Sequence, residues 1–182
     1  MRAQETATTW WLTGLPGAGK TTLAQALARA LRQRGKPVCV IDGDELRAGL
    51  CQDLGFDDAS RAENVRRAAH MARLLNDNAI HAVVAMVSPS ADARAAAYAT
   101  VGLQRCKEIF VSTPLQVCEQ RDPKGLYARA RVNPLAQMTG VQAAYETPLA
   151  PWLSLDTSVT DVPLAVTQML ACCNTHPHPL HE

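Results

Sequence analysis

The chain has 182 residues, 47% of them hydrophobic and 19% charged, which is typical of a folded domain and not of a disordered chain. Lysine and arginine (18) nearly balance aspartate and glutamate (17), and this balance argues against a nucleic acid polymer as partner. No apolar run reaches the roughly 18 to 20 residues that span a bilayer, so we expect no membrane partner. Six cysteines without CxxC spacing and a polar N-terminus without a signal pattern predict reduced thiols in a cytoplasmic protein.

Apolar strands alternate with amphipathic helices along the chain. The predicted strands are 10–13, 38–41, 82–87, 108–111 and 153–155. The predicted helices are 20–34, 61–78, 92–103 and 162–170, with a short one from Pro114. This alternation predicts βαβ units and an α/β fold with a doubly wound, mostly parallel five-stranded sheet and helices on both faces. We expect a single domain over 1–182, with flexible ends at about 1–7 and 174–182.

The strongest motif follows the first strand. It reads Gly14-Leu15-Pro16-Gly17-Ala18-Gly19-Lys20-Thr21 and matches G-x-x-x-x-G-K-[ST] in full. Glycines let backbone N–H groups turn toward phosphate oxygens, and the next helix offers its positive dipole end to the same anion. Residues 14–22, ending in Thr22, are therefore expected to bind ATP, with Lys20 on the β- and γ-phosphates and the Thr21 hydroxyl on Mg²⁺. A plain glycine turn is the alternative.

Two carboxylates, Asp42 and Asp44, end the second strand, at the sheet edge where open α/β folds bind ligands. They suit a Mg²⁺ held through water at Asp42 and a proton acceptor for an attacking hydroxyl at Asp44. The sequence lacks the Asn-Lys-x-Asp motif of GTP switches and the Asp-Glu strand end of motors. Asp44 as a simple cap of the next helix is the alternative, and capping does not exclude catalysis.

A second anion site is indicated downstream. Arg47 lies one helical turn after Asp44, and Arg61 and Asn64 are spaced i, i+3, so that each pair shares a helix face. Arginine forks suit an anion, and an exposed Phe56 between them suits stacking on a base. A solvated helix face is the alternative.

At these residues the chain resembles the adenylylsulfate kinase family. The matching segments are Gly14–Thr22, Asp42–Phe56, Arg61–Arg67, Ser88-Pro89, Arg121–Tyr127, Thr139-Gly140 and Tyr145-Glu146, in family order over about residues 8 to 170. The resemblance implies that Arg47, Arg61 and Asn64 hold the phosphosulfate and ribose of adenylyl sulfate and that Phe56 stacks on its adenine. It makes Asp44 and Lys20 catalytic. The other implied substrate contacts are Asp42, Ser88, Lys124, Gly125, Leu126 and Met138.

Ser88 matches a family serine described as a phosphoserine intermediate, which places it among the catalytic candidates. Its position at the end of a strand beside the phosphates suits a hydrogen-bonding role equally. Direct in-line transfer needs positioning and charge neutralisation but no covalent step, so we favour it.

The basic segment at about 121–140 resembles a lid that closes over the nucleotide and excludes water. Arg121 and Lys124 are the expected ATP contacts within it. A solvated basic loop is the alternative.

Three positions depart from the family pattern. Met138 replaces a second aromatic residue, Ser90-Ala91 replaces His-Arg, and Asn133-Pro134 replaces Gly-Glu. Met138 removes one face of an adenine sandwich, worth about 1 to 3 kcal/mol by analogy with base–aromatic stacking. Met138 and Asn133-Pro134 lie where the selectivity of the acceptor site and of the lid is expected to be set.

The sequence predicts an ATP- and Mg²⁺-dependent kinase that phosphorylates the 3′-hydroxyl of adenylyl sulfate, a step of sulfate activation. The alternatives are the same chemistry on another nucleotide-linked small molecule and a non-catalytic ATP-binding regulatory subunit. A homodimer is compatible with the sequence, and a sulfurylase would be a separate chain. The Cys172-Cys173 and histidine-rich end is expected to be a frayed tail and not a metal site.

Overall fold

In the computed structural model, residues 6–133 and 138–171 are described. Five strands form one parallel sheet in the order β2-β3-β1-β4-β5. They are β1 (Thr9–Thr13), β2 (Val38–Asp42), β3 (His81–Ala85), β4 (Cys106–Val111) and β5 (Leu153–Leu155). The helices are α1 (Lys20–Gln33), α2 (Gly43–Ala48), α3 (Asp58–Asp77), α4 (Ala91–Val101), α5 (Leu115–Arg121), α6 (Leu126–Val132) and α7 (Val162–Ala171). The predicted fold class is confirmed.

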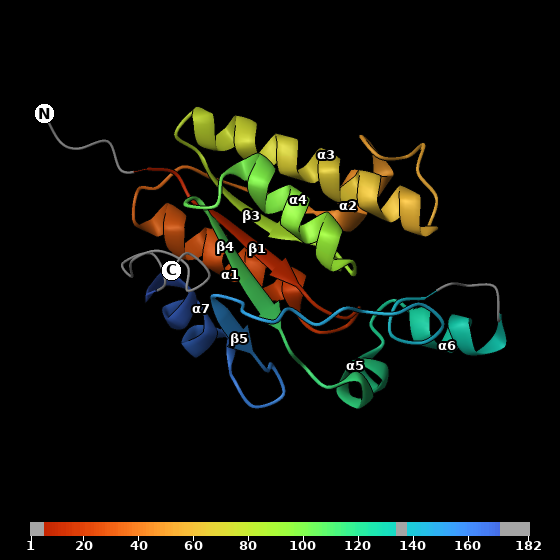
Figure 1. The fold of residues 1–182 in the computed structure, drawn as a ribbon. Helices are drawn as coiled ribbons and strands as arrows, with labels where there is room; N and C mark the ends of the chain where they lie inside the picture. Colours follow the sequence, from red (N-terminus) through yellow and green to blue (C-terminus); the bar gives the residue numbers. More distant parts are fainter. Residues whose placement is uncertain (1–5, 134–137, 172–182) are drawn as a thin grey trace, which may run out of the picture.

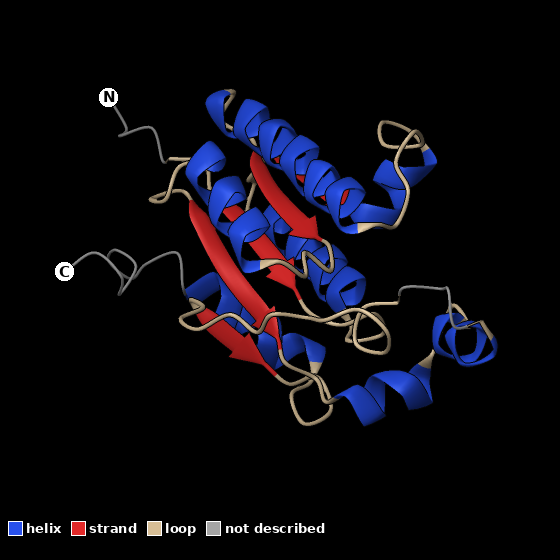
Figure 2. Ribbon diagram, turned by 45° about the vertical axis from the view of Figure 1, so that its right-hand side comes forward, coloured by secondary structure: helices blue, strands red, loops and turns tan. Residues whose placement is uncertain are grey.

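Helices cover both faces of the sheet (Figure 1). α1 and α7 pack together on one face, and α3 and α4 pack together on the other, as Figure 2 shows from a second side. The central strand β1 is buried along its whole length. Trp10 belongs to the core beneath α1 and α7, whereas its neighbour Trp11 belongs to the core beneath α3 and α4. Alternation along one strand thus supplies a large aromatic anchor to each layer.

Capping explains where two helices begin. α3 starts three residues before the predicted position, because the Asp57 carboxylate accepts a hydrogen bond from the backbone N–H of Ser60 (2.9 Å). α2 starts after Asp42, whose side chain caps it. α6 forms inside the basic segment at 121–140, for which the sequence predicted no helix.

At the N-terminal end, Ala7 is buried. Residues 1–5, 134–137 and 172–182, which include Cys172, Cys173 and most of the predicted ends, lie outside the described residues. The thiols of Cys39, Cys51, Cys106 and Cys118 are free. No helix of the described chain is both long and apolar enough to cross a membrane.

Two leucines on helices should differ in how much they contribute to the free energy of unfolding. Leu27 on α1 is fully buried, and Leu74 on α3 is 65% exposed. Leu27→Ala should lower the free energy of unfolding by about 3 kcal/mol, because it leaves a cavity. Leu74→Ala should cost less than about 1 kcal/mol. Urea unfolding followed by circular dichroism measures both, and equal losses would contradict the assignment of this core.

Candidate active site

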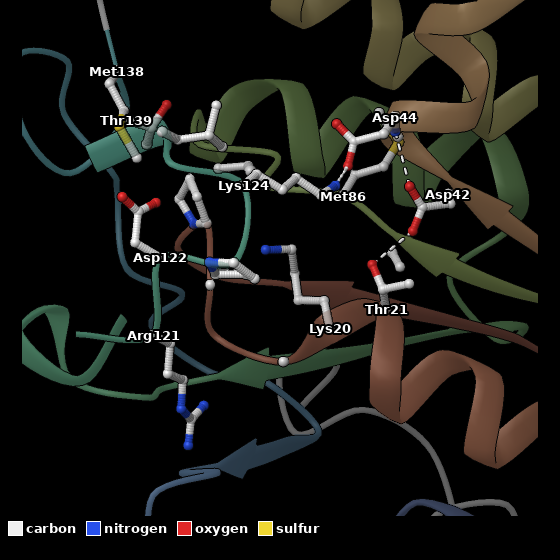
Figure 3. Close-up of a pocket in the computed structure, with 18 of the residues that line it drawn as sticks. Lys20, Thr21, Asp42, Asp44, Met86, Arg121, Asp122, Lys124, Met138 and Thr139 are labelled. Atoms are coloured by element: carbon white, nitrogen blue, oxygen red, sulfur yellow. Dashed lines mark hydrogen bonds and ion pairs between the residues drawn. The ribbon is translucent and has the colours of Figure 1, made fainter. Parts of the chain in front are cut away.

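A cavity of about 1520 Å³ opens at the carboxyl ends of the strands. Residues far apart in the sequence meet there, on the phosphate loop, α2, α3, the loop after β3 and the segment predicted to be a lid. Figure 3 labels residues of all of these except α3. The predicted site residues that line it are Pro16, Gly17, Gly19, Lys20, Thr21, Thr22, Asp42, Asp44, Arg47, Phe56, Arg61, Asn64, Ser88, Arg121, Lys124, Leu126 and Met138. Four predicted residues of the described chain do not line it: Gly14, Leu15, Ala18 and Gly125.

The phosphate loop, residues 14–21, requires glycine where it packs against the body. Gly14 has φ +148°, and a Cβ there would lie 2.5 Å from the carbonyl oxygen of Val111. Gly17 has φ +77°, and its Cβ would lie 2.9 Å from the carbonyl oxygen of Cys118. Both backbones therefore approach β4 and α5 too closely for a side chain, which fixes the shape of the loop.

Lys20 lies across this loop. Its Nζ donates hydrogen bonds to the carbonyl oxygens of Gly14 (2.9 Å) and Leu15 (2.8 Å). Burial of the ammonium group lowers the pKa of Lys20 to about 8, against smaller opposing effects of Cys118 and the nearby aspartates. A cation held at the mouth of the loop is placed to meet a phosphate.

Asp42 joins the phosphate loop to α2. One of its carboxylate oxygens, Oδ2, accepts a hydrogen bond from the Thr21 hydroxyl (2.7 Å). The other, Oδ1, accepts from the backbone N–H of Asp44 (2.9 Å) and so caps α2. The alternative in which Asp44 is the cap is wrong, because Asp44 lies within the first turn of the helix. Its carboxylate is left to face the cavity.

The Asp44 carboxylate forms an ion pair with Nζ of Lys124, which reaches it from the lid (Figure 3). Both side chains are more than half exposed, so solvent screens the pair and it is easily exchanged for other partners. The lid thus touches the carboxylate at the centre of the cavity through a contact that a ligand can replace.

Arg47 and Phe56 form one wall of the cavity. The Arg47 guanidinium lies 4.5 Å from the centroid of the Phe56 ring and donates to the carbonyl oxygen of Gly55 (2.7 Å). The ring is 61% exposed. An exposed aromatic face steadied by a cation suits stacking on a planar ligand.

Arg61 and Asn64 lie on the adjoining wall. Arg61 donates from Nε to the carbonyl oxygen of Phe56 (2.7 Å) and from Nη1 to the Thr139 hydroxyl (2.8 Å). Asn64 is 4% exposed, and its side-chain oxygen Oδ1 has no hydrogen-bond partner within the described residues. A buried acceptor of this kind calls for a donor from a ligand.

Ser88 and Met138 complete this half of the cavity. The Ser88 hydroxyl is buried and accepts a hydrogen bond from the Trp11 indole (3.1 Å). Met138 is 8% exposed and lies with Thr139 on the lid side of the cavity (Figure 3). The structure therefore brings Arg47, Phe56, Arg61, Asn64, Ser88 and Met138 to the wall of one cavity, although the sequence separates them by up to 91 positions (from 47 to 138).

Arg121 lies at the other end, at the base of the lid. It donates from Nη1 to the Thr157 hydroxyl (2.7 Å) and from Nη2 to the Thr157 carbonyl (2.9 Å). The Asp122 carboxylate accepts hydrogen bonds from the backbone N–H groups of Tyr127 (3.1 Å) and Ala128 (3.0 Å), which starts α6. Arg121 is thus bound to the body, whereas Lys124 extends into the cavity.

Sequence reasoning missed several residues of the cavity wall: Met86, Thr139, Thr157, Thr160, Asp161 and Val162. Thr157 is an example, since its hydroxyl donates to the carbonyl oxygen of Ala18 (2.9 Å) in the phosphate loop. Its one signal was its place two residues after the last strand, at the edge where parallel strands present their ligands.

Comparisons with known proteins agree with this geometry. The family model described as adenylylsulphate kinase matches residues 6–156. An adenylyl-sulfate kinase of Pseudomonas aeruginosa is 43% identical over 166 residues, which cover 91% of this chain and 85% of the relative.

Solved structures give the same result. The APS kinase of Mycobacterium tuberculosis in complex with AMPPNP and APS has a TM-score of 0.88 and 40% identity, over 93% of this chain and 99% of the other. A hexameric APS kinase from Thiobacillus denitrificans has a TM-score of 0.71 and 30% identity, and this chain covers 29% of it. The family model over residues 6–156 and the relative of 43% identity show that the chain belongs to the adenylylsulfate kinase family.

Proposed function

We propose that this chain transfers the γ-phosphoryl group of ATP to the 3′-hydroxyl of adenylyl sulfate and releases ADP and 3′-phosphoadenylyl sulfate. The observation that carries the proposal is the single cavity shared by the phosphate loop and the wall of Arg47, Phe56, Arg61 and Asn64. Asp44 lies between these two halves. An enzyme that transfers a phosphoryl group between two bound nucleotides needs this arrangement, because the attacking and leaving oxygens must be held in line.

The chemistry of the acceptor wall supports adenylyl sulfate as the substrate. Arg47 and Arg61 offer forked cations for a phosphosulfate, and Phe56 offers a stacking face for adenine. Phosphosulfate oxygens only accept hydrogen bonds, so the Oδ1 atom of Asn64 needs a ribose hydroxyl or an adenine amino group. The bound APS of the mycobacterial APS kinase structure supports this substrate for a chain of 40% identity.

On the ATP side, we propose that the phosphate loop, with Lys20 and Thr22, binds the phosphates of ATP. Lys20 exchanges its carbonyl partners for phosphate oxygens, and Lys124 and Arg121 add positive charge from the lid. Donors fixed before the reaction stabilise the charge that spreads over the transferring phosphoryl group. Closure of the lid also keeps water, the competing acceptor, away from the γ-phosphate.

The donor set beside the loop fits Mg²⁺. The Thr21 hydroxyl and the Asp42 carboxylate are hard oxygen ligands 2.7 Å apart. Magnesium in kinases is held by one or two such groups, together with phosphates and waters. The described residues contain no cluster of three or more His, Cys, Asp or Glu side chains that could hold a metal ion without such a ligand. When bound, the ion neutralises phosphate charge.

Asp44 is the proposed proton acceptor. The acceptor's 3′-oxygen forms a bond to the γ-phosphorus as the bond to the β-phosphate oxygen breaks, and ADP leaves with that electron pair. The proton of the hydroxyl passes to the Asp44 carboxylate, which Lys124 vacates as it turns to the phosphates. Ser88 needs no covalent role in this direct transfer, and its buried hydroxyl accepts a hydrogen bond from the Trp11 indole.

We propose that the whole chain is a single kinase domain, since all five strands of the described chain share one sheet. We also propose a cytoplasmic location, because a reducing compartment suits the free thiols of Cys39, Cys51, Cys106 and Cys118.

The reaction is tested by ADP release with Mg-ATP and adenylyl sulfate, with AMP and cytidine nucleotides in parallel. We expect turnover that depends on adenylyl sulfate. Lys20→Ala should lower it at least about 100-fold, because the main cation on the phosphates is lost. Lys36→Ala, outside the cavity, should change it less than about twofold. Turnover with another acceptor alone would overturn the substrate, and ATP binding without any transfer would favour the non-catalytic alternative.

Arg61 should act on the acceptor and not on ATP. Arg61→Ala removes a charge-assisted contact worth about 1.5 to 3 kcal/mol, so the KM for adenylyl sulfate should rise about 10- to 100-fold. The KM for ATP should stay nearly constant. Arg66→Ala is the matched control, since that side chain is 57% exposed and pairs with Glu63. Steady-state kinetics with each substrate varied separately measures both KM values. An unchanged KM for adenylyl sulfate would show that Arg61 does not bind the acceptor.

The lowered pKa of Lys20 predicts a pH dependence of ATP binding. Above about pH 8 the free protein carries mostly neutral Lys20, whereas bound phosphates favour the ammonium form. Binding then takes up a proton, and the Kd for ATP should rise up to about tenfold per pH unit above pH 8. Calorimetry in two buffers of different ionisation enthalpy measures both effects. Lys20→Arg should flatten the profile, and a flat wild-type profile from pH 7 to 9.5 contradicts the prediction.

A further inference from the structure

A buried arginine outside the cavity holds together segments that form its wall. Arg94 lies on α4, and its side chain is 4% exposed. It is not part of the cavity wall. Its guanidinium nevertheless donates hydrogen bonds to backbone carbonyls of two loops that end at the cavity, and it pairs with a buried carboxylate from β4.

The first of these loops contains Ser88. Arg94 donates from Nη1 to the carbonyl oxygens of Ser88 (2.9 Å) and Pro89 (3.2 Å). Ser88 has φ +45°, a conformation that residues other than glycine adopt only when their surroundings enforce it. The bond from Arg94 fixes the Ser88 carbonyl on one side, while the Trp11 indole fixes its hydroxyl on the other.

The second loop returns from the lid. Arg94 donates from Nη2 to the carbonyl oxygen of Glu146 (2.7 Å), and the Glu146 N–H donates to the Pro89 carbonyl (2.9 Å). The guanidinium also lies 5.8 Å from the Tyr145 ring, whose hydroxyl is 2.9 Å from that of Thr13 just before the phosphate loop. The two loops are therefore tied to each other and to the end of β1.

The return loop carries the lid side of the acceptor wall. Met138 and Thr139 line the cavity, and the Met138 carbonyl accepts hydrogen bonds from the N–H groups of Val141 (3.1 Å) and Ala143 (3.0 Å). This compact turn connects the wall directly to Tyr145 and Glu146. A shift of Glu146 would therefore be transmitted to Met138 and to the Thr139 hydroxyl that Arg61 contacts.

The third partner of the Arg94 guanidinium is Glu108 on β4. The Nε atom of Arg94 lies 3.1 Å from the carboxylate oxygen Oε1 of Glu108. Tyr98 donates its hydroxyl to the same carboxylate oxygen (2.7 Å). A planar guanidinium can satisfy a carboxylate and several carbonyls at fixed angles, whereas a lysine ammonium is a single point donor. A lysine would also balance the charge of Glu108, but only an arginine can contact this carboxylate and the carbonyl oxygens of both loops at the same time.

We propose that Arg94 is a positioning residue of the phosphoryl transfer, which holds Ser88 and the Met138–Thr139 wall in register for the acceptor. The proposal rests on the proposed function. Arg94 acts from behind the wall, through the backbone of the two loops, and it touches neither nucleotide. Its loss should therefore be felt in the use of the acceptor, while the phosphate loop keeps its own contacts to β4 and α5.

Arg94→Lys is the central test, because it keeps a cation beside Glu108 but not the fork. The kcat/KM for adenylyl sulfate should fall at least about tenfold, mostly through KM, as expected when the wall that binds the acceptor is displaced. The Kd for ATP should stay within about twofold. In a second variant, Arg94→Met with Glu108→Met, apolar side chains replace the whole buried pair, so the fold no longer depends on an unpaired charge. It should show the same kinetic defect.

Tyr98→Phe is the matched control. It removes a hydrogen bond to Glu108 and keeps the ring beside Trp11, so it weakens the cluster without freeing either loop. Its acceptor KM should equal that of the wild type. If Arg94→Lys or the double variant keeps the wild-type kcat/KM, the proposal is overturned. It is also overturned if Tyr98→Phe, at a similar loss of unfolding free energy, raises the acceptor KM equally.

Hydrogen exchange separates this proposal from the reaction itself. The amides of Ala91 and Glu146 are both bonded across the two loops. In Arg94→Lys they should exchange at least about tenfold faster, while the amides of α1 keep their rates. If the wild-type protein does not phosphorylate adenylyl sulfate, the proposed substrate is wrong, and hydrogen exchange becomes the deciding measurement for Arg94. Unchanged exchange rates in Arg94→Lys would refute the role of Arg94.

Discussion

The rest of the site depends on the Asp42 carboxylate, which connects the phosphate loop to α2. It ends β2, one oxygen accepts from the Thr21 hydroxyl, and the other caps α2. Because the first bond belongs to the phosphate loop and the second starts the helix that carries Asp44 and Arg47, the phosphate loop and these two side chains are set at a fixed separation. In-line transfer tolerates little error in that separation. A short polar side chain at the end of a buried strand, where the sheet allows almost no movement, is well suited to fix it.

Much of this architecture follows from the sequence. The apolar runs of 10–13 and 38–41 are too short and too β-branched or aromatic to be core helices, and the phosphate loop fixes the strand–helix order around them. The predicted strands and helices are all present, with ends displaced by up to three residues. The displacements have local causes. In α3, for example, the Asp57 cap starts the helix well before Val65, where the apolar residues of its buried face begin.

The remainder of the site depends on long-range packing that no local pattern encodes. Thr157 and Asp161 line the cavity because the edge strand β5 pairs with β4, and a three-residue strand leaves a weak signal. The Lys124–Asp44 pair joins residues 80 positions apart. The burial of Arg94 on α4 has the same origin, because the Glu108 carboxylate and the carbonyl oxygens of Ser88 and Glu146 come to it from other elements.

The two adjacent tryptophans of β1 have a spectroscopic consequence. Both are fully buried, yet the Trp11 indole donates to Ser88 at the acceptor wall and the Trp10 indole donates to the carbonyl oxygen of Met169 on α7 (3.2 Å). Indole emission responds to nearby charge and polarity, so the two side chains are optical sensors of opposite faces of one sheet. The two indoles therefore lie, one residue apart in the sequence, in two different environments, one beside Ser88 and the other beside α7.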